Sequence, residues 1–191
     1  MQMAKLNSNM LVKGARGHVG RQFVYKQRAN QTVIAKMPEV NKNLIPSQEQ
    51  ITVRDQFTAA VVYAKGAMGD PLLKSEYQKK ANASRTAYNI AFRDYLKAPA
   101  VTSINSEAYD GAVGSIITVS AKDDFRVAEV RVSITDINGN LVEKGLAVQH
   151  AIDRNKWNYA ATVAVAAIAG FIITAEALDI PGNKAGLEII L

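Results

Sequence analysis

The sequence predicts an α+β fold, in which an N-terminal β-hairpin and a helical segment precede an antiparallel β-sandwich. Three patterns indicate this order: apolar and polar side chains alternate over 22–37, apolar residues follow a helical spacing over 47–98, and about seven short strands separated by turns fill 99–191. No β-α-β alternation is present, which excludes a parallel nucleotide-binding sheet. We expect three regions, a basic β-hairpin arm over 1–46, the helical segment and the sandwich.

The arm is punctuated by glycines. Gly14, Gly17 and Gly20 recur at every third position, and a strand pattern rather than a helix follows them. A dinucleotide-binding loop needs a helix at that point, so this motif is excluded. We interpret the three glycines as sites of tight turns or of close backbone approach.

A hairpin is predicted next, with strands over 22–27 and 32–37, a turn over 28–31, and Pro38 ending the second strand. Basic side chains with aromatic ones between them predict a surface that contacts a partner or nucleic acid, although a solvated basic surface shows the same pattern. The candidate contact residues are Lys13, Arg16, Arg21, Phe23, Tyr25, Lys26 and Arg28.

Three helices are predicted over 47–98. Ser47 and Gln50 fit a capping box at the start of the first helix, and Asp70 and Pro71 fit an N-cap and first position of the second. The apolar face of the first helix comprises Val53, Phe57, Ala60, Val61, Ala64 and Met68. The third helix carries a polar and basic ridge, which we interpret as a solvent face: Arg85, Asn89, Arg93 and Lys97.

The last region has the alternation of a half-buried sheet. Over 127–135, Val130, Val132 and Ile134 fall on one face. The segment 136–140 contains Asn-Gly, a strong hairpin signal. It begins like a calcium loop, but its glycine comes two positions early, so a turn is predicted.

Charge is divided unevenly along the chain. Residues 1–50 hold eight Lys/Arg against two Asp/Glu, 51–98 hold eight against four, and 99–191 hold seven against eleven. The first half is therefore basic and the sandwich acidic. Such asymmetry suggests that the basic half meets an acidic partner, either nucleic acid or the acidic half of a neighbouring copy, although a solvated basic surface gives the same charge distribution.

Nothing in the sequence indicates catalysis. The chain has no cysteine, its histidines His18 and His150 are far apart, and no serine lies in a Gly-x-Ser-x-Gly elbow. We expect no catalytic residue, no metal and no cofactor. The N-terminus lacks the apolar core of a signal peptide, and the uncharged run 158–175 is rich in alanine, so we expect cytoplasmic synthesis and no membrane span.

Two resemblances add to these patterns. With the 136–140 turn, Trp157-x-Tyr159 and the 179–183 turn, the segment 115–191 resembles a bacterial immunoglobulin-like or fibronectin-type sandwich. The whole chain is similar to an uncharacterised family of Bacteroides-group bacteria and their phages or mobile elements. The N-terminal residues that carry this similarity are Gly14, Gly17, Gly20, Pro38, the segment Pro46–Gln50, Arg54 and Phe57. The resemblance implies no activity, so it supplies no catalytic residue.

These observations favour a non-enzymatic structural or assembly protein. The leading hypothesis is a bacteriophage virion component, capsid-associated or in the neck or tail, that uses its basic arm for assembly contacts as a homo-oligomer or in a larger assembly. One alternative is a surface adhesion or glycan-binding immunoglobulin-like module that displays Trp157 or Tyr159 to a ligand. The other is a DNA-binding accessory protein.

Overall fold

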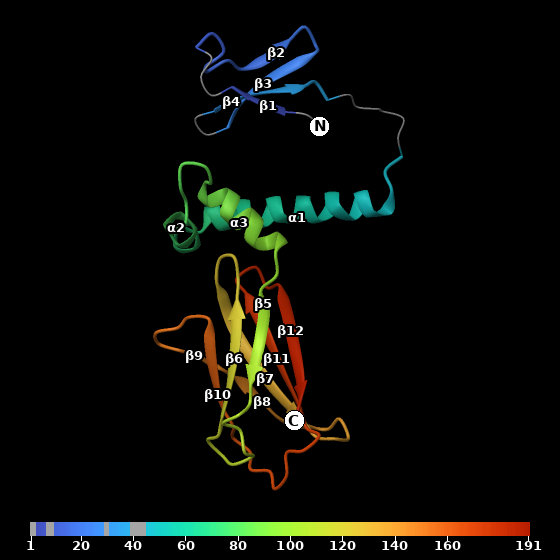
Figure 1. Ribbon diagram of the computed structural model, residues 1–191, viewed down its shortest axis with the longest axis vertical. Helices are drawn as coiled ribbons and strands as arrows, with labels where there is room; N and C mark the ends of the chain where they lie inside the picture. Colours follow the sequence, from blue (N-terminus) through green and yellow to red (C-terminus); the bar gives the residue numbers. More distant parts are fainter. Residues whose placement is uncertain (1–2, 7–9, 29–30, 39–44) are drawn as a thin grey trace. The chain divides into compact units, whose positions relative to one another are not determined.

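The structure is a computed structural model, and it describes residues 3–6, 10–28, 31–38 and 45–191 (Figure 1). Over these residues the chain forms one antiparallel sheet, then helices, then two further antiparallel sheets. The predicted α+β fold with a β-sandwich is confirmed. Contacts group the chain into two compact units, one of Met1–Ala59 with Ala67–Ile90 and one of Ala60–Gly66 with Ala91–Leu191.

The N-terminal arm is a four-stranded sheet in the order β1-β4-β3-β2, which is larger than the predicted hairpin. Its strands are β1 (Met3–Leu6), β2 (Gly17–Val19), β3 (Phe23–Arg28) and β4 (Gln31–Lys36). The hairpin of β3 and β4 is confirmed, with Phe23 opposite Lys36. Residues 29–30 of the predicted 28–31 turn lie outside the described residues. A lone hairpin is marginal in water, and here β1 and β2 each cover one of its edges.

Three helices follow, α1 (Gln48–Gly69), α2 (Pro71–Lys79) and α3 (Ala87–Leu96). The capping box is confirmed, because the Gln50 N–H donates to Ser47 Oγ and the Ser47 N–H donates to Gln50 Oε1, both at 3.3 Å. The N-cap of α2 is also confirmed: Asp70 Oδ1 accepts from the first backbone N–H groups of the helix. Among the described residues, no helix is long and apolar enough to cross a membrane.

The predicted apolar face of α1 is buried only along its second half. Ala60 and Ala64 are fully buried, whereas Val53 is 63% exposed and Phe57 55% exposed. Helical spacing predicts which residues share a face of the helix, but it does not predict whether another element packs on that face.

The sandwich consists of the sheets β5-β6-β10-β9 and β12-β11-β7-β8. Its strands are β5 (Ala100–Asn105), β6 (Ile116–Lys122), β7 (Val127–Thr135), β8 (Leu141–Leu146), β9 (Val148–Gln149), β10 (Lys156–Ala160), β11 (Ile172–Asp179) and β12 (Lys184–Ile190). The predicted inward row of β7 is confirmed, since Val130, Val132 and Ile134 are fully buried. Trp157 and Tyr159 point into the same core from β10.

The two predicted turns, at 136–140 and 179–183, are present, and an aspartate side chain closes each of them. At 136–140, Asp136 Oδ1 accepts the N–H groups of Asn138 at 2.8 Å and of Asn140 at 2.9 Å. These bonds, with the Asn140 side-chain amide making the largest contribution, hold the pKa of Asp136 below its ordinary value. At the end of β11, Asp179 Oδ1 accepts from the Gly182 and Asn183 N–H groups in the same way.

Candidate functional site

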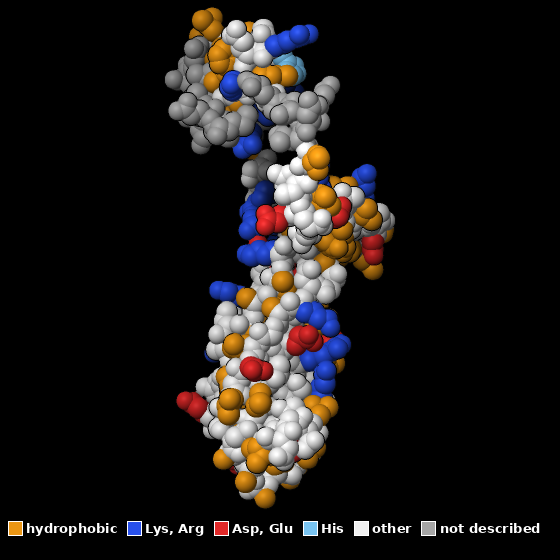
Figure 2. Space-filling model, turned by 90° about the vertical axis from the view of Figure 1, so that its right-hand side faces the viewer, with side chains coloured by type: hydrophobic (Ala, Val, Ile, Leu, Met, Phe, Trp, Pro, Cys, Tyr) orange, Lys and Arg blue, Asp and Glu red, His pale blue; other side chains and the backbone are white. Residues whose placement is uncertain are grey.

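The segment that forms the N-terminal sheet carries the largest net charge of the three regions of the chain. Residues 1–38 contain seven Lys/Arg and no Asp or Glu. Figure 2 shows basic (blue) and apolar (orange) side chains together on the described part of this sheet, and no acidic (red) ones. A folded surface with charges of one sign attracts ligands of the opposite sign over long range.

The β2–β3 turn places one of these cations in an unusual backbone conformation. Gly20 has a φ of 56° and Arg21 a φ of 55°, and the Gln22 N–H donates to the Val19 carbonyl at 3.1 Å. Positive φ values at both central residues of the 19–22 β-turn are typical of type I′. Glycine or asparagine usually occupies these positions, so an arginine in this conformation strains the backbone.

An open hollow lies beside this turn. Its volume is about 590 Å³. Its lining combines two cations, an aromatic ring and apolar atoms: Arg21, Gln22, Phe23, Lys36, Met37 and Pro38. The ring of Phe23 is 44% exposed. The arrangement can hold a flat or apolar group next to an anionic one.

The structure divides the predicted contact residues between two faces of the sheet. Because side chains alternate along a strand, Phe23 and Tyr25 of β3 share one face, and Lys26 and Arg28 belong to the other. The sequence prediction omitted Lys36, which joins Phe23 because the two residues are cross-strand partners. Only the β3–β4 register could have revealed this neighbour.

Lys13 and Arg16 lie in the loop that precedes β2. This loop is tied to the sheet where the Gly14 N–H donates to Thr32 Oγ1 and Gln27 Nε2 donates to the Ala15 carbonyl, each at 3.1 Å. Gln27 shares a strand face with Phe23 and Tyr25, so the two loop cations lie at the same side of the sheet as the aromatic rings.

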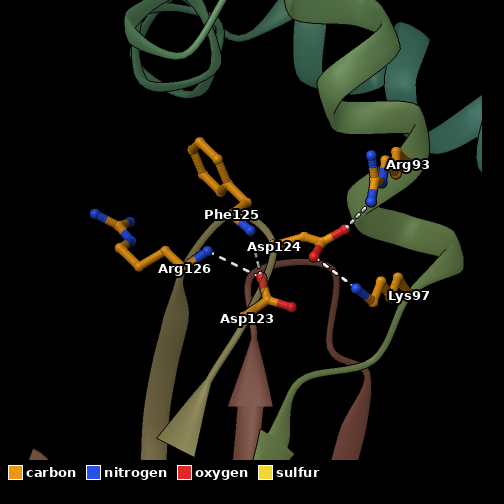
Figure 3. A network of polar contacts seen from close by, with 6 residues as sticks. All are labelled: Arg93, Lys97, Asp123, Asp124, Phe125 and Arg126. Atoms are coloured by element: carbon orange, nitrogen blue, oxygen red, sulfur yellow. Dashed lines mark hydrogen bonds and ion pairs between the residues drawn. The ribbon is translucent and has the colours of Figure 1, made fainter. Parts of the chain in front are cut away.

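A second polar feature joins α3 to the sandwich (Figure 3). Arg93 Nη2 lies 2.7 Å from Asp124 Oδ2, and Lys97 Nζ lies 2.6 Å from Asp124 Oδ1. All four residues of the predicted α3 ridge are exposed, so the solvent face is confirmed, and Arg93 and Lys97 also pair with Asp124. The hydrogen bond from Lys97, with added attraction from both cations, lowers the pKa of Asp124.

Asn183 extends this joint to the end of α3. Its side-chain Nδ2 lies 3.3 Å from the Asp94 carbonyl, 3.1 Å from the Tyr95 carbonyl and 2.8 Å from Asp179 Oδ2. The last carbonyls of a helix have no partner within the helix. The Asp179 turn thus supplies donors that close the end of α3 against the sandwich.

Three carboxylates meet at this joint. Asp94, Asp123 and Asp179 each place an oxygen within 4.8 Å of the other two, and Asp94 and Asp179 are 1% and 3% exposed. Burial, with added repulsion from Asp123, raises the pKa of Asp179. Such a group favours an added proton, and carboxylate oxygens are also ligands that hard cations take. No sequence pattern could predict the group, because its members come from three separate parts of the chain.

We expect this joint to make the sandwich more stable as the pH falls through the raised pKa of Asp179 toward the ordinary aspartate value of 3.8. A carboxyl whose folded pKa lies above its ordinary value of 3.8 contributes stability at low pH and loses it as the pH rises through the folded pKa. Urea unfolding followed by the fluorescence of Trp157, the one tryptophan of the chain, measures the effect.

Asp123→Asn is the matched variant, because its amide oxygen can still accept from the Phe125 and Arg126 N–H groups while its charge is lost. The variant should show a shallower dependence on pH. A wild-type sandwich that gains stability as the pH rises over the same interval would contradict the expectation. Asp124 affects stability only at lower pH. Its pKa lies below the ordinary value of 3.8, so protonating it lowers the free energy of unfolding only as the pH falls below 3.8.

No family model and no curated protein matches the chain. Among solved structures, CopC from Methylosinus trichosporium OB3b aligns with 47% of this chain and 87% of its own at 18% identity and a TM-score of 0.35. A tetra-tandem repeat in the extending region of a large adhesion protein aligns with 48% of this chain and 22% of its own at 19% identity and a TM-score of 0.32. Similarity this low carries no functional argument.

Proposed function

We propose that this protein is a non-enzymatic assembly component, specifically a bacteriophage virion protein of the capsid-associated, neck or tail class, and that its basic N-terminal sheet makes the assembly contacts. The observation that supports the proposal best is the charge of that sheet, with seven Lys/Arg and no acidic residue in 1–38. Like charges concentrated in one small sheet repel one another, so an acidic partner stabilises them.

The organisation of the chain supports the same proposal. A basic sheet and a β-sandwich are linked by helices, and α3 is fastened to the sandwich through Asp124 and Asn183. The resemblance of the chain to a family of Bacteroides-group bacteria and their phages or mobile elements, and of 115–191 to immunoglobulin-like sandwiches, fits a virion role. In such a role the sandwich is scaffold and the sheet makes the contact.

The alternative of an adhesion or glycan-binding module lacks the aromatic platform that it needs. Trp157 is 6% exposed and Tyr159 3% exposed, so neither ring can stack on a sugar. Both residues belong to the core that joins the two sheets.

Sedimentation velocity over a concentration series tests the proposal. We expect wild-type protein to form oligomers as its concentration rises and to dissociate at high salt, because salt screens charged contacts. Arg21→Glu with Lys36→Glu should shift the association to higher concentration by at least about tenfold, which corresponds to about 1.4 kcal/mol.

The control reverses two exposed cations on the helices, Lys65→Glu with Lys74→Glu, which changes the net charge equally. It should associate like wild type. If wild-type protein stays monomeric at every concentration, or if both double variants weaken association equally, the basic sheet is not the assembly surface.

A further inference from the structure

We propose that the hollow beside the β2–β3 turn binds a single-stranded nucleic acid, with a base stacked on Phe23 and backbone phosphates held by Arg21 and Lys36. This inference goes beyond the proposed assembly role and stands independently of it, because a monomer already contains every residue involved. The hollow of about 590 Å³ is open to solvent, as a site that admits a strand must be.

Register and turn geometry bring the three residues together from separate elements. Arg21 lies in the turn, Phe23 begins β3 two positions later, and Lys36 is the β4 residue directly opposite Phe23. Directly opposed residues of an antiparallel pair project from the same face about 5 Å apart. A half-exposed ring is thus flanked by two cations on one lining surface.

This combination matches the chemistry of unpaired nucleotides. Proteins that bind single strands combine a basic groove along the backbone with aromatic rings on which bases stack. Met37 and Pro38 add apolar atoms to the lining, which suit the edge of a stacked base. In a duplex the faces of the bases are already stacked on each other, so Phe23 could not be used in this way.

The conformation of Arg21 supports a ligand role. At a φ of 55° glycine would fit with less strain than arginine, and the turn needs no arginine for its own hydrogen bond. Strained residues of this kind concentrate at sites of binding. Arg21 lies at the hairpin tip and lines the hollow.

For this hollow, a nucleic acid offers a denser row of negative charges than the sandwich of a second copy does. The eleven acidic residues of 99–191 exceed the seven basic ones, but Glu143 and Asp179 are buried and add nothing to the outer surface. Several of the remaining carboxylates already pair with cations of their own unit, as Asp124 does with Arg93 and Lys97. The sandwich therefore presents fewer free carboxylates than its sequence count suggests, whereas every nucleotide brings a phosphate.

The site continues along β3. Tyr25 follows Phe23 on the same face, about 7 Å further along the strand. Its neighbour on β2 is Gly17, which has no side chain to cover the ring from that side. Lys13 and Arg16 lie in the loop fastened at this side of the sheet, so a strand that leaves Phe23 meets a second ring and two further cations.

Fluorescence anisotropy tests the inference with a labelled oligothymidylate of about 12 nucleotides and a duplex of equal length as probes, at protein concentrations where the chain sediments as a monomer. Phe23→Ala should weaken binding of the single strand by about 5- to 150-fold and leave binding of the duplex unchanged. Arg21→Gly should weaken binding and reduce the slope of log K against log salt by about 0.7, while thermal stability stays the same or rises.

Leu72→Ala is the control for loss of an exposed apolar side chain, since Leu72 is 82% exposed on α2, and Lys74→Gln is the control for loss of a cation. Both should bind the strand like wild type. The inference is overturned if wild type does not bind the strand at low salt, if strand and duplex bind equally, or if Phe23→Ala leaves strand binding unchanged. The binding assay uses monomeric protein, so it does not depend on self-association. A strand that does not bind would leave the assembly proposal standing, and a protein that does not assemble could still be tested for strand binding.

Discussion

Replacing Trp157 with alanine should lower the free energy of unfolding of the sandwich by about 3 to 5 kcal/mol. The side chain is 6% exposed, and its strand pairs Trp157 with Val119 across β10 and β6. Alanine would leave a cavity between the two sheets, which close-packed neighbours fill only in part. Urea unfolding followed by far-ultraviolet circular dichroism measures the loss, since the variant has no tryptophan to report it.

Trp157→Phe is the matched control. The indole Nε1–H is buried without a hydrogen-bond partner among the described residues, so phenylalanine loses volume but no bond. We expect it to cost less than half as much as alanine. Equal losses in the two variants, or a loss below about 1 kcal/mol in the alanine variant, would show that Trp157 is not a core residue.

Replacing Glu143 with alanine should cost about 3 kcal/mol. Glu143 Oε2 accepts four hydrogen bonds inside the sandwich, and the residue is 6% exposed. The donors are the Tyr159 hydroxyl at 3.0 Å, the Thr162 N–H at 2.8 Å, the Thr162 hydroxyl at 2.7 Å and the Val163 N–H at 3.3 Å. Without the Glu143 carboxylate these four donors lose their acceptor, and a buried donor without a partner costs about 1 to 3 kcal/mol.

Trp157 fluorescence during urea unfolding measures this effect, and Glu143→Gln tests its cause. Glutamine keeps one oxygen as an acceptor for these donors, so we expect a loss of about 1 kcal/mol. Glu188→Ala, at an exposed position on β12, should change stability by less than about 0.5 kcal/mol. A Glu143→Ala protein as stable as the Glu188→Ala protein would contradict the assignment.

The strands of the sandwich were predicted well, because strand alternation and turn motifs depend only on residues close together in the sequence. The alternation of Val130, Val132 and Ile134 and the Asn-Gly turn depend on neighbours in sequence, and both are present in the structure. Helix starts are local too, so Ser47 and Asp70 could be identified. The strands β1 and β2 were missed because they are short and gain their stability by pairing with a hairpin already formed.

Features that depend on distant partners could not be predicted. Arg93 and Lys97 are exposed as predicted, but their pairing with Asp124 could not be predicted, because Asp124 lies in a different element. Tyr159 packs where residue 145 is glycine, since a Cβ there would meet the ring at 2.7 Å. Periodicity within one segment carries no information on either contact.

The candidate contact surface was predicted in part. Arg21 and Phe23 were selected from their residue types, and both line the hollow. Lys36 was missed, because its place beside Phe23 follows from strand register, and Lys26 and Arg28 fall on the opposite face of β3 because side chains alternate. Residue type and charge therefore predicted the region of the contact surface. The strand register and the alternation of side chains were needed to tell which residues share a face.

Carbodiimide cross-linking of mixed light-nitrogen and heavy-nitrogen copies tests most directly whether the basic sheet makes the assembly contact. The reagent joins lysine amines to carboxylates that are already in contact, and a link between isotopes identifies two different chains. We expect heavy-to-light links from Lys13, Lys26 or Lys36, lost at high salt. Heavy-to-light links that come only from lysines outside the sheet, in protein that is oligomeric, would contradict the proposed role of the sheet.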